Sequence, residues 1–352
     1  MPQTHGRALR LTKGKTGFAM LILLLAVALV TAVLFSVATG AVRVSPAAIL
    51  AALFGHHPLS ATQEIILLQI RLPRVLASGI VGAALAISGL MFQGLFRNPM
   101  ADPYVIGSSG GAVLGACIGI FFFSQLSLFG FSATALLAFA GSVITMALVY
   151  SLARSNGRTN VITLLLAGFA VSTMLGYSSY FFEAFDSGSG SNHLILLSWL
   201  HGVIGIPHWT QLSVSASFLA FAALGAMPLM RRLNTLALGD EYAHQLGLKV
   251  EYTRIGIILM GSLLTAVAVS LGGLISFAGL IVPHVARLLL GPDHVRLLPV
   301  TALTGAIFLV IADTFARSMF APSEIPVGIL MAFLGGPFFL YLLRKTKRSY
   351  VL

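Results

Sequence analysis

Long apolar runs separated by short polar connections dominate the chain. Because a helix needs about 20 apolar residues to cross the ~30 Å hydrocarbon core of a bilayer, each run is a candidate membrane-spanning helix. The runs are continuous and do not alternate as barrel strands do. They predict an all-α, polytopic integral membrane protein with about ten transmembrane helices, at about 18–39, 66–96, 106–124, 131–153, 160–183, 208–230, 252–272, 276–290, 296–319 and 325–344.

Composition supports a membrane location. The chain has 352 residues, of which 57% are hydrophobic and only 9% charged. A soluble protein carries roughly 25% charged residues, so this chain cannot cover a water-exposed surface of its size with charge. In a bilayer the backbone must satisfy its own hydrogen bonds, which helices do. The first apolar run is about 21 residues long, more than the ~7–15 of a cleaved signal, and is expected to be retained.

The basic residues predict an orientation. The net charge is +11, which in a soluble protein would suggest nucleic acid, but here Lys and Arg lie between apolar runs and no nucleic acid is expected. With the basic N-terminal segment 1–17 placed in the cytoplasm, 17 of the 21 basic residues fall on the same side. The outer side keeps Arg43, Arg71, Arg74 and Arg317. Such a bias predicts an even number of crossings and two cytoplasmic termini.

No catalytic or nucleotide-binding motif is recognisable. Gly14-Lys15-Thr16 matches the end of a phosphate-binding loop, but Leu9 stands where its first glycine belongs. We therefore expect no ATP, cofactor or metal bound by this chain and no catalytic residue. His193, His201 and His208 leave a haem or metal ligand set open as an alternative to interfacial polar residues.

The acidic residues bear on the energy source. All ten fall near the ends of the runs or in connections, and the deepest, Asp313, can pair with Arg317 four residues on. Carriers driven by protons or sodium usually keep ionisable groups in mid-membrane, so the pattern favours energy supplied by another protein. A proton-coupled secondary transporter remains the alternative of a different class.

Glycines recur every four residues in the third run, at Gly107, Gly111, Gly115 and Gly119. This spacing lines one helix face and lets another backbone approach closely. We expect helix packing within the bundle, with a dimer face or a pore lining as alternatives.

Four stretches together resemble the FecCD family of binding-protein-dependent permeases, from about residue 43 to the C-terminus. They are Arg71–Arg74 running into Gly82–Gly89, Arg97–Pro103 followed by Gly107–Gly111, Leu238–Gly247, and Gly279–Arg287 with Ala312–Arg317. The resemblance implies a type II ABC importer permease fold in a single transmembrane domain, 1–352. It implies import of an iron–siderophore or related metal chelate, with vitamin B12 or haem as alternative cargoes.

The resemblance also implies partners. They are a second permease copy in a homodimer or heterodimer, two ATP-binding cassette subunits that bind ATP and Mg, and a periplasmic or lipid-anchored substrate-binding protein. The location implied is the cytoplasmic (inner) membrane of a prokaryote. Arg71, Arg74 and Arg317 match family arginines that meet acidic residues of the binding protein, and guanidinium groups suit bidentate carboxylate pairing. For Arg71 and Arg74 the alternative is snorkelling at the interface.

Segment 235–247 resembles the family's cytoplasmic coupling helices, which contact the ATPase. Leu236, Ala243, Leu246 and Leu248 are the expected apolar anchors, and Gly247 suits a helix C-cap. The coupling residues expected are Leu238, Gly239, Asp240, Glu241, Tyr242, Ala243, His244, Gln245, Leu246 and Gly247. An amphipathic helix lying on the bilayer is the alternative.

A cytoplasmic gate is expected by analogy at Asn98, Pro99 and Met100 and at Asn160, Val161 and Ile162. Relatives carry small hydroxyl residues where this chain has Val161 and Ile162, so the sequence departs from the family pattern there.

Overall fold

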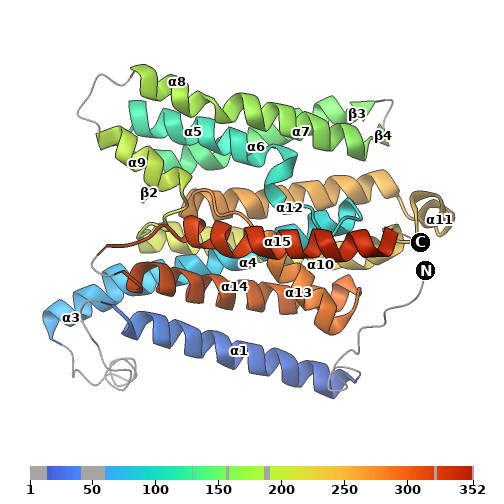
Figure 1. Ribbon diagram of the computed structural model, residues 1–352, viewed down its shortest axis with the longest axis horizontal. Coiled ribbons are helices and arrows are strands. Elements are labelled where there is room, and N and C mark those ends of the chain that lie inside the picture. Colours follow the sequence, from blue (N-terminus) through green and yellow to red (C-terminus); the bar gives the residue numbers. More distant parts are fainter. Residues whose placement is uncertain are drawn as a thin grey trace.

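The computed structural model is a bundle of helices that run side by side along the long axis of the molecule (Figure 1). It describes residues 14–40, 60–128, 130–155, 158–185, 191–320 and 323–350. Most of the basic N-terminal segment and Arg43 lie outside the described residues. In chain order the helices are α1 (Lys15–Ala38), α3 (Ala61–Ile65), the π-helical η2 (Ile66–Arg71), α4 (Leu72–Leu95), the 3₁₀ turn η3 (Pro103–Ile106), α5 (Ser108–Phe122), α6 (Ala133–Ala153), α7 (Val161–Gly176), α8 (Ser178–Phe185), α9 (Ser191–Leu200), α10 (Trp209–Leu236), α11 (Asp240–Gln245), α12 (Val250–Gly272), α13 (Ala278–Leu290), α14 (His294–Ser318) and α15 (Val327–Tyr350).

The prediction of an all-α membrane protein is confirmed. Among the described residues, seven helical stretches are long and apolar enough to cross a bilayer, and three shorter apolar helices occupy the remaining predicted runs, at Ser108–Phe122, Ala278–Leu290 and Val327–Leu342. The number of actual crossings stays a prediction. Strand is limited to two minimal antiparallel hairpins in the part described, β1 (Ser127–Leu128) with β2 (Phe131–Ser132) and β3 (Arg154–Ser155) with β4 (Arg158–Thr159).

Two features differ from the predicted runs. The fifth run is divided at Tyr177 into α7 and α8. Helix α9 lies in a segment that the sequence predicts to be a polar outer connection. Its ten residues are too few to cross a bilayer, but they are apolar enough to pack against the bundle. Leu196 of α9 is buried against Val113, Cys117 and Ile120 of α5.

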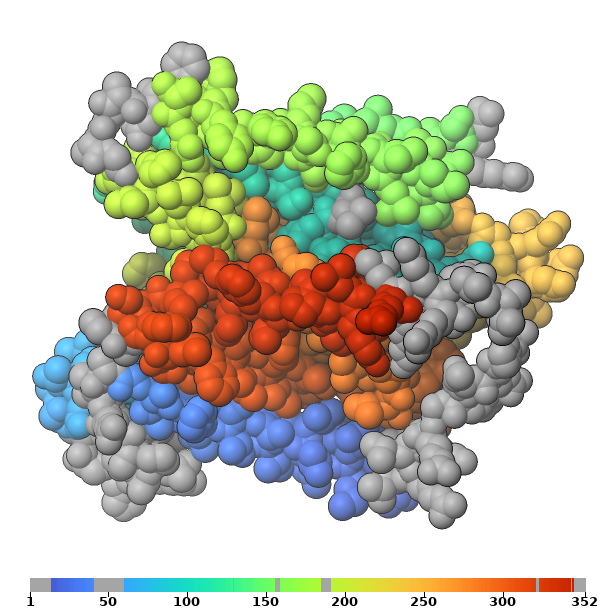
Figure 2. Space-filling view, in the orientation of Figure 1, coloured from blue at the N-terminus to red at the C-terminus, as the bar shows by residue number. Residues whose placement is uncertain are grey.

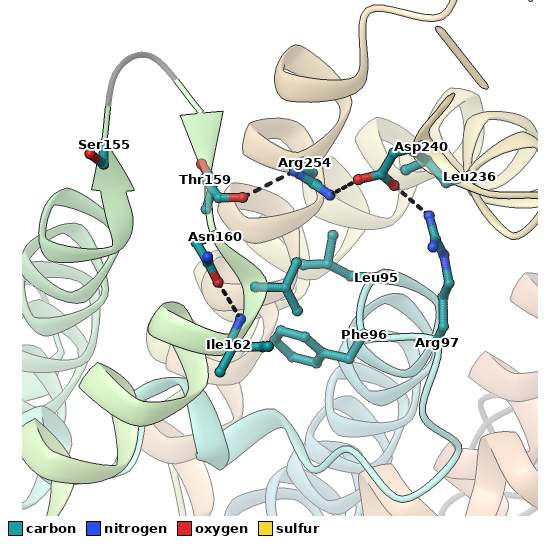
Figure 3. A pocket seen from close by; sticks show the side chains of 11 residues that line it. Leu95, Phe96, Arg97, Ser155, Thr159, Asn160, Ile162, Leu236, Asp240 and Arg254 are labelled. Carbon is teal, nitrogen blue, oxygen red and sulfur yellow. Dashed lines mark hydrogen bonds and ion pairs between the residues drawn. The ribbon is translucent and has the colours of Figure 1, made fainter. Parts of the chain in front are cut away.

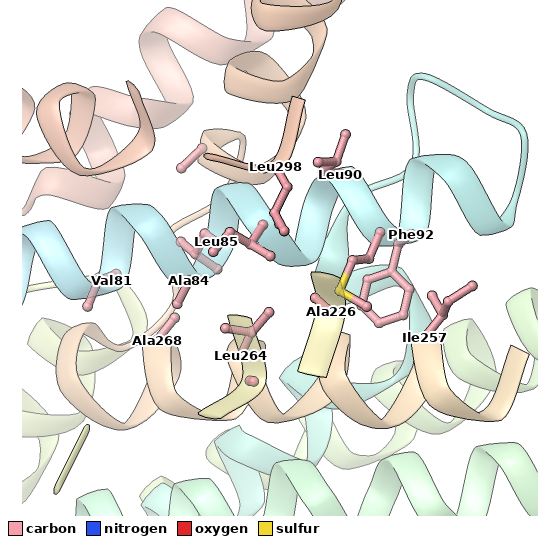
Figure 4. Packing of buried hydrophobic residues seen from close by; sticks show 14 of the residues in the cluster. Val81, Ala84, Leu85, Leu90, Phe92, Ala226, Ile257, Leu264, Ala268 and Leu298 are labelled. Carbon is pink, nitrogen blue, oxygen red and sulfur yellow. The ribbon is translucent and has the colours of Figure 1, made fainter. Parts of the chain in front are cut away.

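Helix α4 runs through the middle of the bundle. Nearly all of its residues from Val75 to Leu95 are buried, although the helix is long enough to span a membrane. Figure 4 shows its side chains packed against Ala226 of α10, Leu264 and Ala268 of α12, and Leu298 of α14. Neighbouring helices therefore replace lipid around almost the whole circumference of α4.

Glycines bring other backbones into direct contact with α4. A Cβ added at Gly82 would lie 2.2 Å from the Gly305 carbonyl oxygen of α14, and one added at Gly89 would lie 1.8 Å from the Gly279 carbonyl oxygen of α13. No side chain fits at these distances. Close backbone approach is how helices associate strongly in a solvent that is itself apolar.

Three of the four spaced glycines make a similar contact between α5 and α6. A Cβ at Gly111 would lie 2.2 Å from the Gly141 carbonyl oxygen, and one at Gly115 would lie 2.0 Å from that of Leu137. Gly119 faces the backbone of Thr134. Gly107 differs, because it precedes α5 with a φ of +100° and serves the turn from η3.

The contact at Gly89 generates a test of this packing. Gly89→Ala should lower the free energy of unfolding by about 1–3 kcal/mol, because the new methyl group must displace the backbone of α13. Thermal unfolding of the purified protein in detergent measures the loss. Gly176→Ala is the matched control, since a Cβ there meets no atom within 4 Å. Equal stability of the two variants would contradict the packing described.

Candidate functional site

Helix α11 is a short helix with a glycine C-cap, at the end of the bundle that also holds β3 and β4 (Figure 1). It begins after Gly239, which has a φ of +118°. It ends at Gln245, two residues before Gly247, which has a φ of +79°. There the Leu248 amide donates to the Ala243 carbonyl at 3.0 Å, and the Gly247 amide to that of His244 at 2.9 Å. This pair of bonds is the glycine C-cap motif expected from the sequence.

The apolar residues around α11 divide between its two faces. Ala243 and Leu236 are buried inside the bundle, so the prediction that they anchor a partner is wrong. Ala243 is inward because it packs into the main core, together with Leu236 at the end of α10. The exposed apolar side chains are Leu238, Tyr242 and Leu246, at 63%, 66% and 68% of their maximal accessible area. These three form the outward apolar surface of the segment.

Asp240 ties α11 to the rest of the protein. Its carboxylate pairs with Arg97, just beyond the end of α4, and with Arg254 of α12 (Figure 3). Arg254 also donates to the Thr159 carbonyl oxygen at 3.0 Å. The Thr159 amide in turn donates to Glu251 at 3.1 Å. One carboxylate thus links α11 to α4, α12 and the β3–β4 hairpin.

A cavity of about 540 Å³ opens beside this network. Among its lining residues are Arg97, Asp240 and Arg254 together with the predicted gate residues Asn160, Val161 and Ile162 (Figure 3). Asn160 caps α7, because its side chain accepts from the amides of Ile162 at 2.9 Å and Thr163 at 3.1 Å. The structure therefore places the start of α7 and the start of α11 on one cavity.

The other half of the predicted gate lies next to the cavity. The Asn98 side chain accepts from the Met100 amide at 3.0 Å, which closes a tight turn around Pro99. This turn follows Arg97, whose φ of +50° redirects the chain after α4. Arg97 lines the cavity, whereas the residues 98–100 are not among its lining residues.

The three predicted docking arginines gather at the opposite end of the bundle, where they are largely buried. Arg74 of α4 donates to Asp313 at 3.1 Å and to Glu324 at 2.7 Å. Arg317 lies 3.8 Å from the Asp313 carboxylate, as the spacing of the two residues predicts. We call Arg71, Arg74 and Arg317, with the carboxylates of Asp313 and Glu324, the outer arginine cluster.

The cluster also fastens α1. Arg71 donates to the Val37 carbonyl oxygen at 3.0 Å, and Arg317 donates to the Ser36 hydroxyl at 2.9 Å and to the Ser36 carbonyl oxygen. A buried guanidinium is costly without acceptors, so these bonds stabilise the end of α1 against α4 and α14. Sequence reasoning found the arginines but missed these partners, which are distant in the chain and carry no local motif.

The histidines of the outer segment are dispersed. His193 lies 3.5 Å from Glu183. Within the described residues no three His, Cys, Asp or Glu side chains are close enough to hold a metal ion.

Comparison with known proteins gives consistent matches. The model of the FecCD transport family matches residues 26–345. The cobalamin import system permease protein BtuC of Halobacterium salinarum is 44% identical over 286 residues, covering 81% of this chain and 75% of the relative. The hemin transport system permease protein HmuU of Yersinia pestis is 40% identical over 285 residues, which cover 80% of this chain and 84% of the relative. A solved structure described as an inward-facing metal-chelate type ABC transporter has a TM-score of 0.81 and 30% identity, and covers 93% of this chain and 99% of its own.

The ion network at Asp240 predicts a local stability difference. Asp240→Asn should increase amide hydrogen exchange of residues 243–248, because α11 loses the charge that holds Arg97 and Arg254. Glu241→Gln is the matched control: Glu241 is the exposed neighbour and is not the carboxylate that pairs with these arginines. Hydrogen exchange with mass spectrometry on the purified chain distinguishes them. Unchanged exchange in Asp240→Asn would show that the network does not hold the helix.

Proposed function

The chain belongs to the FecCD transport family, and on this premise we propose that it is the permease subunit of an ATP-driven importer in the inner membrane of a prokaryote. The relatives are transport permeases rather than enzymes. The single observation that carries the proposal is α11, a capped helix that presents three exposed apolar side chains and is tied through Asp240 to the cavity beside the gate residues. Both termini are proposed to be cytoplasmic, on the side of α11.

The energy is proposed to come from two separate ATPase subunits, which bind ATP and Mg. Leu238, Tyr242 and Leu246 supply an apolar surface of the kind that seats in a groove of a partner. Glu241 and His244 are exposed on the same segment and can fix its orientation. The wider coupling segment 235–247 is retained in this proposal, with Leu236 and Ala243 assigned to the inner face.

Transmission from ATPase to gate is proposed to pass through Asp240. When the ATPases close, α11 is displaced, and its displacement alters the pairs of Asp240 with Arg97 and Arg254. Arg97 leads into the turn at Asn98–Met100, and Arg254 reaches the residue before Asn160 through the Thr159 carbonyl oxygen. Each half of the proposed gate is therefore connected to the carboxylate through one arginine.

A second permease copy is proposed to cover the face seen in Figure 2, along which α7 and α15 lie. Large apolar side chains are exposed on both helices, among them Leu166 and Phe169 of α7 and Phe333 and Leu340 of α15. A translocation path between two copies would place these helices along it. The partner is a copy of this chain or a close paralogue.

A substrate-binding protein is proposed to dock on the outer arginine cluster. The cluster lies at the end of the bundle opposite α11, which is the periplasmic end if α11 meets the ATPases. Arg71, Arg74 and Arg317 would orient acidic residues of that protein, with part of their charge already used inside the chain.

The proposed cargo is a metal ion enclosed in a large organic ligand. Cobalamin, hemin and metal chelates, which appear in the descriptions of the similar proteins, share this chemistry. A ferric siderophore is the first candidate, and vitamin B12 and haem are the others. The chain itself carries out no covalent step; it needs only different affinities for the states of its partners.

Uptake by the reconstituted complex tests the proposal. Proteoliposomes that contain this chain, its ATPase subunits and its binding protein should accumulate one cargo of a panel of ferric siderophore, vitamin B12 and haem. They should do so only when ATP is supplied on the side of the membrane that carries the ATPase subunits. A protonophore should have no effect. Uptake without the ATPase subunits, stopped by protonophore, would establish a proton-coupled carrier instead.

The exposed surface of α11 predicts a coupling defect. Tyr242→Ala or Leu246→Ala should weaken ATPase binding by about tenfold or more, as truncation of a central apolar anchor does at other interfaces. Co-purification and ATP-dependent uptake measure the loss. Leu24→Ala, which removes an equally exposed apolar side chain on α1, is the control and should leave both unchanged.

A further inference from the structure

Glu324 lies in the connection from α14 to α15 and reaches back to α4. The Ile325 amide donates to the Ala316 carbonyl oxygen at 3.0 Å, which holds this connection against the end of α14. From there the Glu324 carboxylate accepts from Arg74 Nη1 at 2.7 Å. Sequence reasoning gave Glu324 no role, since its partner is 250 residues away.

The two carboxylates on Arg74 differ in their surroundings. Asp313 is buried, with 2% of its side chain exposed, and it also lies beside Arg317. Glu324 has 51% of its side chain exposed, whereas Arg74 has 12%. Asp313 is therefore a permanent internal partner, and Glu324 is a partner that water can reach and replace.

Both terminal nitrogens of Arg74 already donate to a carboxylate, so the guanidinium has little space for another one. Nη2 is engaged by Asp313 and Nη1 by Glu324, so an incoming acidic side chain would meet the Glu324 carboxylate at the accessible edge of the guanidinium. Like charges at that distance repel, and simultaneous binding is disfavoured.

We propose that Glu324 is an internal competitor of the docking partner, and that an acidic side chain of the substrate-binding protein displaces it from Arg74 during docking. This inference rests on the proposed docking role of the outer arginine cluster. Asp313 stays paired with Arg74 throughout, so the guanidinium is never left without a carboxylate while Glu324 leaves and the incoming side chain binds. The freed Glu324 turns into water, where its charge is solvated.

The competition lowers the apparent affinity of docking by the fraction of molecules in which Arg74 is free of Glu324. A half-exposed ion pair is weak, with a free energy that corresponds to about two- to fivefold in an equilibrium constant. Removing the competitor should therefore tighten docking by about that factor.

The test measures the dissociation constant of the system's own substrate-binding protein for the full-length chain, assembled with its ATPase subunits in lipid nanodiscs. Glu324→Gln should lower the dissociation constant about two- to fivefold. In an Arg74→Gln background the same change should have no effect, because the competed group is gone. Higher salt should reduce the gain in the single variant.

Glu64→Gln is the control for charge alone. Glu64 lies on α3 at the same end of the bundle, and its substitution removes the same charge without touching the Arg74–Glu324 pair. An equal gain in Glu64→Gln, or unchanged or weaker docking in Glu324→Gln, would overturn the competition. If Arg74→Gln itself leaves docking unchanged, the docking role of Arg74 fails; if it weakens docking while Glu324→Gln has no effect, only the exchange fails.

Discussion

Direct contact between helix backbones around α4 is the constraint on which the rest of the structure depends. Lipid is as apolar as a leucine side chain, so burying apolar surface does not by itself hold membrane helices together. At Gly82 and Gly89 the absence of a side chain lets α14 and α13 approach to a distance that only glycine allows. The positions of α13 and α14 follow from these contacts, and with α14 the position of Asp313 and Arg317 in the outer arginine cluster.

The two polar clusters share one arrangement. At one end the carboxylate of Asp240 lies between Arg97 and Arg254, and at the other that of Asp313 lies between Arg74 and Arg317. Each joins helices that are far apart in the sequence. Asp313 is buried, and an unpaired charge left there is strongly destabilising; because two arginines share its carboxylate, one pair can change while the other stays formed.

Much of the fold could be predicted from the chain alone, because each apolar run stands on its own against the thickness of a bilayer. The apolar runs, the C-cap at Gly247 and the pairing of Asp313 with Arg317 depend on neighbouring residues and were found. Helix α9, the inward face of Ala243 and the partners of Arg74 depend on contacts between distant segments, and no local pattern indicates them. The motifs therefore indicate where the candidate site lies, but which side chains face outward had to come from the structure.

Arg74 and Arg97 stand at opposite ends of the same rigid helix, separated by about 35 Å at the usual rise per residue. Packed on nearly all sides and in backbone contact with two neighbours, α4 has little freedom to bend. A small tilt about its middle would move its two ends in opposite directions, as a lever does. A rigid-body tilt of this helix would transmit a displacement caused by docking on one side of the membrane to the other side, without any change in the helix itself.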